Sequence, residues 1–133
     1  DQRCPLCRAP ARKSDAEWLR RVQKHVVKGN AYAQVQLADA YRQGGMGLKQ
    51  SSERAGELYE LAAAQGQPQG QAQLGWCYAT GNGVEIDLET AALWYRRAAE
   101  QGLPAAQSNI GRMLYHGNGV AQSYDEAVRW YRP

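Results

Sequence analysis

The chain has 133 residues, of which 44% are hydrophobic and 22% are charged, and its net charge is +3. This composition is ordinary for a soluble globular domain, and the sequence has no apolar run of about 18 residues that could form a transmembrane helix. Residues 1–28 are basic, but apolar residues interrupt their charges, which argues against a dedicated nucleic-acid arm. A solvated linker and helix face is favoured over contact with an acidic partner.

The first chemical signal along the chain is the pair Cys4 and Cys7, which has the C-x-x-C spacing. Such a turn can present two thiolates to one Zn²⁺ ion, and tetrahedral zinc needs two further ligands. The other candidates are Cys77 and two distant histidines, so we expect the remaining ligands upstream of residue 1. A redox-active pair would require a βαβ context, and a chance pairing is the third interpretation.

The residues around this pair, Arg3-Cys4-Pro5-Leu6-Cys7-Arg8, resemble the closing C-P-x-C-R of a RING-type zinc finger. The resemblance implies that residues 1–13 are the C-terminal remnant of such a finger. It implies that Cys4 and Cys7 bind zinc and that Pro5 contacts a ubiquitin-conjugating enzyme. Arg8 would then bridge this enzyme and the ubiquitin that it carries.

Residues 14–29 are predicted to form a capping helix. Ser14 and Glu17 have the spacing of a capping box, and Gly29 suits the position after a helix end. One apolar stripe at helical spacing consists of Trp18, Leu19, Val22 and Val26. This stripe should cover the open face of the repeat that follows.

The rest of the chain repeats with a period of 36 residues, and one extra residue lies in the loop at 44–47. Each unit is predicted to form a helix A, a glycine turn and a helix B. Helix A is expected at 31–43, 68–80 and 104–116. Helix B should begin after a capping side chain and end before a glycine. The capping residues are Ser51, Asp87 and Ser123, and the glycines are Gly66 and Gly102.

These units resemble Sel-one-like repeats, which are relatives of tetratricopeptide repeats. The second unit carries the resemblance in Leu74-Gly75, Tyr78, Gly81, Gly83, Val84, Ala91, Trp94-Tyr95, Ala98-Ala99 and Gly102. The first unit departs from the pattern, with Ala38 and Leu58 at the Gly75 and Trp94 positions. The resemblance implies an all-α fold, a right-handed α-α superhelix of three repeats at 30–66, 67–102 and 103–133. The last repeat lacks the Ala-Ala-x-x-Gly ending that the earlier repeats have at 62–66 and 98–102, so we expect the chain to be a fragment.

A stack of such units has a concave side on which another protein can bind. The expected partner-binding residues vary between repeats and lie on one face of helix A; they are Gln36, Asp39, Gln73, Trp76, Asn109 and Arg112. Trp76 could instead be a packing aromatic residue, and Cys77 is expected to pack between helices. Arg96 is expected on the outer face of helix B.

No catalytic site is predicted within residues 14–133. The G-x-G elements at 81–83 and 117–119 recur at the repeat period and lack a following Gly-Lys-Ser/Thr, which favours turns over phosphate-binding loops. Two histidines far apart give no basis for a catalytic triad. His25 is expected to be structural and His116 to be a solvated turn residue.

The combined hypothesis is a protein-binding scaffold, namely the substrate-binding part of a RING-type ubiquitin-protein ligase. One alternative is a non-enzymatic adaptor with a structural zinc module, and another is an adaptor in endoplasmic-reticulum-associated degradation. An odd number of cysteines does not suggest a disulfide framework. We therefore expect a reducing, cytoplasmic location.

Overall fold

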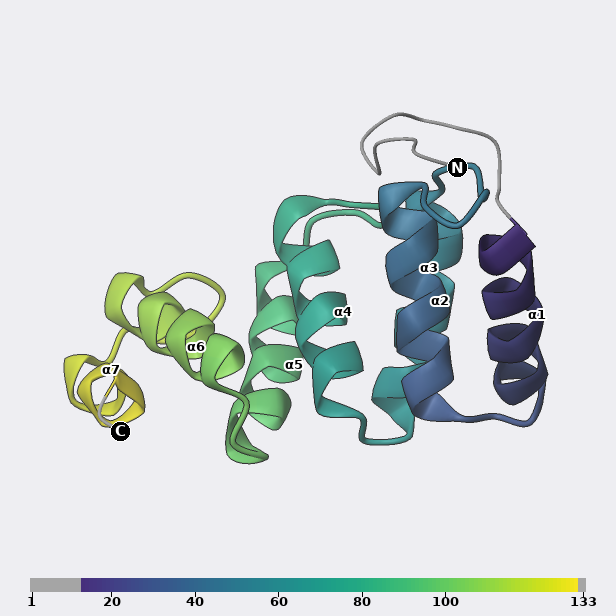
Figure 1. Ribbon diagram of the computed structural model, residues 1–133. Helices are drawn as coiled ribbons and strands as arrows, with labels where there is room; N and C mark the ends of the chain where they lie inside the picture. Colours follow the sequence, from purple (N-terminus) through teal and green to yellow (C-terminus); the bar gives the residue numbers. More distant parts are fainter. Residues whose placement is uncertain (1–12, 132–133) are drawn as a thin grey trace, which may run out of the picture.

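The computed structural model describes residues 13–131, and this part of the chain consists of α-helices joined by turns, with no strand. The helices are α1 Lys13–Val27, α2 Ala31–Gln43, α3 Ser52–Ala64, α4 Pro68–Thr80, α5 Leu88–Glu100, α6 Pro104–His116 and α7 Tyr124–Tyr131. Figure 1 shows them stacked in sequence order along an elongated array, in which the helix axes turn progressively from α1 to α7. The predicted all-α solenoid is confirmed.

Local capping chemistry explains where the helices begin. The A helices α2, α4 and α6 have the predicted bounds, and Pro68 and Pro104 lie at the starts of α4 and α6. Before the B helices, the side chains of Ser51 and Asp87 accept hydrogen bonds from the backbone N–H groups of Arg54 and Thr90. Both capping predictions are therefore confirmed. Ser123 makes the equivalent bond before α7, where its Oγ accepts from Glu126 N at 3.2 Å.

The start of α1 differs from the prediction. The helix begins at Lys13, so Ser14 lies inside its first turn and is not the residue that precedes it. The apolar stripe nonetheless packs as its spacing suggests. Val22 is buried with Ala33 and Leu37 of α2, and the partly buried residues around them include Trp18, Leu19 and Val26.

The G-x-G element at 81–83 is a turn, as predicted. Gly81 ends α4 with φ 75° in the left-handed region, which suits a residue without a Cβ atom. Gly83 also has a positive φ, and a Cβ atom at this position would lie 2.6 Å from the backbone oxygen of Ser52. The second glycine therefore lets one repeat pack closely on the helix B start of the repeat before it.

Glutamine side chains join the two helices within a repeat, which no sequence pattern predicts. Gln34 and Gln71 are buried at equivalent positions of α2 and α4. Gln65 Nε2 donates to Gln34 Oε1 at 2.9 Å, and Gln101 Nε2 donates to Gln71 Oε1 at 2.8 Å. Each pair ties the beginning of a helix A to the end of its helix B.

The first two A helices lie on the inner side of the array. Consecutive helices pack on each other throughout the described chain, and α2 additionally packs directly against α4. No two B helices in residues 13–131 pack on each other to the same extent. Helices that come closer together line the inside of a curved stack, which places α2 and α4 there. No helix within residues 13–131 is long and apolar enough to cross a membrane.

Candidate protein-binding face

The predicted partner-binding residues lie at equivalent positions of α2, α4 and α6, and we call them the helix A face. They are Gln36 and Asp39 on α2, Gln73 and Trp76 on α4, and Asn109 and Arg112 on α6. Trp76 and Arg112 are exposed, and the other four are partly exposed. All six side chains are thus accessible to a partner.

Asp39 belongs to a polar network that connects α2 and α3. The Tyr59 hydroxyl donates a hydrogen bond to Asp39 Oδ1, and Arg42 Nε donates to the Tyr59 oxygen at 3.0 Å. The Arg42 guanidinium also lies 3.7 Å from Asp39 Oδ1. Burial, together with the bond to Asp39, raises the pKa of Tyr59 far above its usual value. The hydroxyl therefore stays protonated and remains a donor.

Arg42 extends this network to α4. Its guanidinium carbon lies 5.8 Å from the centre of the Trp76 ring, which is the geometry of a cation–π contact. The hydrogen bond to Tyr59 is the largest cause that raises the pKa of Arg42, so the Arg42 side chain stays positively charged. Trp76 is 37% exposed, and it lies outside the buried core clusters of the described chain. Trp76 therefore lies outside the buried core of the described chain and packs against Arg42 at its surface.

Sequence reasoning missed Arg42, although a signal was present. Asp39 and Arg42 are three residues apart on one helix and so lie on the same side of it. Tyr59 occupies a repeated tyrosine position whose second copy is Tyr95. In the second repeat, Ala79 stands where Arg42 stands in the first, so this network belongs to the first repeat.

The remaining residues of the helix A face are not used for internal bonding. Gln36, Gln73, Asn109 and Arg112 have no hydrogen bond or ion pair within residues 13–131. Arg112 acts electrostatically on the buried Tyr95. Burial raises the pKa of Tyr95 to about 12, and the positive charge of Arg112 partly opposes this shift.

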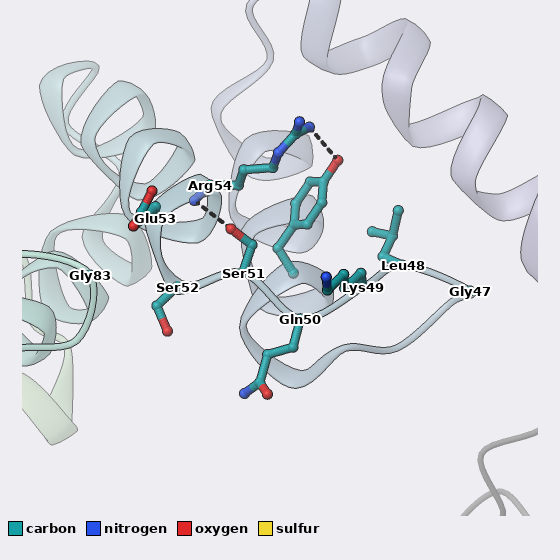
Figure 2. Close-up of a pocket in the computed structure, with 10 residues that line it drawn as sticks. Gly47, Leu48, Lys49, Gln50, Ser51, Ser52, Glu53, Arg54 and Gly83 are labelled. Carbon is teal, nitrogen blue, oxygen red and sulfur yellow. Dashed lines mark hydrogen bonds between the residues drawn. The ribbon is translucent and has the colours of Figure 1, made fainter.

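An open hollow lies at the edge of the first repeat, where α2 leads into α3 (Figure 2). Its lining comes from the turn at 47–51, the first turn of α3 and Gly83 of the next repeat. Arg54 lies over the Tyr41 ring at 5.6 Å and donates to the Tyr41 hydroxyl at 3.4 Å. Ser51 is occupied as the N-cap of α3. These polar groups serve the turn and form no catalytic arrangement.

The predicted zinc and ubiquitin-transfer residues, Cys4, Pro5, Cys7 and Arg8, lie outside the described residues. Between residues 13 and 131, no three His, Cys, Asp or Glu side chains are grouped in a way that could hold a metal ion. Cys77 is buried, and burial raises the pKa of its thiol. It is thus a packing residue, as predicted.

Arg96, which the sequence places on the outer face of α5, has a partner in the next repeat. Its Nη1 donates to Glu126 Oε2 of α7 at 2.5 Å, and both side chains are about one-third exposed. Arg96 reaches the next repeat because its long side chain spans the gap between the two B helices.

Comparisons with known proteins agree with this architecture. A family model described as "Sel1 repeat" matches residues 31–67, 68–103 and 104–133. A Sel1 repeat protein from Oxalobacter formigenes is 39% identical, with a TM-score of 0.78 over 85% of this chain and 84% of that chain. A comparison with curated protein sequences gave no match.

Two further solved structures are similar. A protective antigen of uropathogenic Escherichia coli strains with an SLR fold is 37% identical, with a TM-score of 0.82 over 86% of this chain. The match covers only 24% of that antigen. Cysteine-rich protein B of Helicobacter pylori is 19% identical, with a TM-score of 0.67 over 89% of this chain and 84% of that chain, which shows likeness of fold alone. The chain therefore belongs to the Sel1 repeat family, whose members serve as scaffolds for protein–protein interaction.

Proposed function

We propose that the chain binds a partner protein along the helix A face. The observation that carries this proposal is Trp76, which is exposed on α4 and held by the guanidinium of Arg42 from α2. An aromatic side chain that is fixed before binding loses little conformational entropy when a partner covers it. Tryptophan and arginine are also the residues that most often dominate the energy of an interface.

The test is a binding assay with a partner protein captured by the purified chain. Trp76→Ala and Arg112→Glu should each weaken the affinity at least tenfold and leave the melting temperature unchanged within a few degrees. Arg20→Glu on α1 is the matched control, because Arg20 is exposed and lies off the helix A face. Arg96 is unsuitable as a control because it pairs with Glu126. If Arg20→Glu weakened binding and Arg112→Glu did not, the proposed face would be wrong.

We further propose that the full protein is a RING-type ubiquitin-protein ligase in which this solenoid selects the substrate. The observation in favour is the C-P-x-C-R string at residues 4–8, just before α1. In this proposal Cys4 and Cys7 bind zinc with ligands from a preceding segment, and Pro5 and Arg8 face a ubiquitin-conjugating enzyme. The rivals are an adaptor whose zinc module is only structural and an adaptor of endoplasmic-reticulum-associated degradation.

The sequence of the segment before residue 1 separates these proposals. Two more ligand pairs at RING spacing, together with zinc in the purified protein, would support the ligase. A signal peptide would support the lumenal adaptor and contradict the cytoplasmic location that we propose. Zinc binding without ubiquitin transfer, across a panel of conjugating enzymes, would support the structural module.

A further inference from the structure

Three carboxamide side chains occupy one equivalent position in consecutive repeats. Gln36, Gln73 and Asn109 follow one another at intervals of 37 and 36 residues and lie on α2, α4 and α6. All three are partly exposed. We call these three residues the amide ladder. Its members lie on three helices that follow one another along the array (Figure 1).

The amide ladder differs from the other repeated glutamines in its bonding. Elsewhere the carboxamides hold the solenoid together, as in the Gln34–Gln65 and Gln71–Gln101 pairs and in the bond from Gln107 to the Ala99 carbonyl. The three ladder residues, by contrast, have no hydrogen bond within residues 13–131. Their donors and acceptors are therefore available to a ligand.

The spacing of the ladder fits an extended polypeptide. Packed helices lie about 8–10 Å apart, and α2 packs directly against α4. An extended chain advances about 3.3 Å per residue, so about three of its residues span the step from α2 to α4. A carboxamide offers both a donor and an acceptor, and a peptide unit of an extended chain offers the complementary pair. In a helical ligand these backbone groups already form hydrogen bonds with each other, so they are not available to the ladder.

The charges beside the ladder predict which peptides bind. The negative charge of Asp39 is matched by Arg42 and by the Tyr59 hydroxyl. Arg112, one helical turn from Asn109, is exposed and unpaired within the described residues. The α6 end of the face therefore attracts an acidic side chain, and the exposed ring of Trp76 offers an apolar contact near its centre.

We propose that the amide ladder binds the backbone of an extended, acidic segment of the partner protein. Each carboxamide bonds one peptide unit, at about every third residue of the segment. Arg112 pairs with a carboxylate of the segment and so fixes its direction. This inference rests on the proposed binding role of the helix A face and specifies the kind of segment that the face accepts.

The test uses a displayed library of random 12-residue peptides, selected on the purified chain. We expect selected sequences to carry an Asp or Glu and to bind Gln36→Ala, Gln73→Ala and Asn109→Ala about tenfold more weakly each. Gln23→Ala on α1 is the matched control, since Gln23 is exposed, has no internal bond and lies off the face. N-methylation of the peptide backbone at positions about three residues apart should also weaken binding about tenfold.

The outcomes separate this inference from the broader proposal. If Trp76→Ala and Arg112→Glu abolish binding but the ladder variants and the N-methylated peptides bind normally, the face binds through other contacts and the ladder inference is wrong. If all of these variants bind normally, both proposals fail. A library that yields no binder, or only basic peptides, also overturns the inference.

Discussion

The Arg42 guanidinium on α2 lies 5.8 Å from the centre of the Trp76 ring on α4. Arg42 is itself fixed by its bond to Tyr59 of α3 and by its ion pair with Asp39. A residue on the inner surface is thus positioned by three helices from two repeats. This arrangement connects the buried packing of the first repeat with the exposed surface that we propose for binding.

Tyr59→Phe should destabilise the chain by about 1–2 kcal/mol, because it leaves Asp39 and Arg42 without the hydroxyl that joins them. Tyr95→Phe is the matched control. Tyr95 is the equivalent buried tyrosine of the second repeat, and its hydroxyl has no hydrogen bond within the described residues. Urea unfolding measures both changes. Equal losses of stability in the two variants would contradict a specific role for the network.

Gly83→Ala should cost more than Gly66→Ala. Both glycines have a positive φ, so both variants carry the backbone penalty of about 1 kcal/mol. A Cβ at position 83 would also meet the Ser52 backbone at 2.6 Å, whereas nothing lies within 4 Å of a Cβ at position 66. We expect an additional loss of about 1–3 kcal/mol at position 83, from overpacking between repeats. Thermal melting of the two variants gives the difference, and equal melting temperatures would show that the repeats separate easily there.

The ion pair between Arg96 and Glu126 should make stability depend on pH. The hydrogen bond from Arg96 is the main cause that lowers the pKa of Glu126. A carboxylate with a lowered folded-state pKa stabilises the protein above its unfolded-state pKa, and this contribution is lost as the pH falls through the folded-state value. Because both side chains are about one-third exposed, the effect should stay below about 1 kcal/mol.

Glu126→Gln should remove the pH dependence of stability that this ion pair contributes at pH values below the usual pKa of glutamate. It should also reduce the salt dependence of the melting temperature. Glu60→Gln is the control, since Glu60 is exposed and has no partner within the described residues. An acid-melting curve for Glu126→Gln that matches the native chain would mean that the pair adds nothing.

Arg8→Ala in the full-length protein should lower ubiquitin discharge from a charged conjugating enzyme about tenfold, equivalent to about 1.4 kcal/mol in the barrier. The planar guanidinium can bond carbonyl groups on two proteins at once, which would hold the ubiquitin tail in a reactive orientation. Zinc content should stay unchanged.

Cys4→Ser should instead release zinc and unfold the module, because metal binding and folding are coupled. The two variants therefore separate a transfer role from a structural one. A native rate of discharge in Arg8→Ala would refute the bridging role of this residue.

Local chemistry made the helix bounds predictable from the sequence. The A helices match their predicted ranges, because caps such as Ser51 and Asp87, and turns such as that at Gly81, depend on residues close together in the chain. The 36-residue period then required every unit to stack in the same way. The start of α1 deviated, because the helix begins at Lys13 and includes Ser14, which the sequence predicted as its cap.

Contacts between helices were decided by the tertiary structure alone. The bond between Arg42 and Tyr59 joins residues 17 apart, the Gln65–Gln34 bond joins residues 31 apart, and the Arg96–Glu126 pair joins residues 30 apart. Repetition in the sequence shows that such positions are equivalent, but it does not show which long side chains reach across. The sequence by itself therefore determined a stack of Sel1 repeats and the equivalent positions that make up the helix A face. Packing decided which of those residues are held in place, such as Asp39, and which remain available to a partner, such as Gln73. The reason is that hydrogen bonds between helices depend on distances that no local sequence pattern encodes.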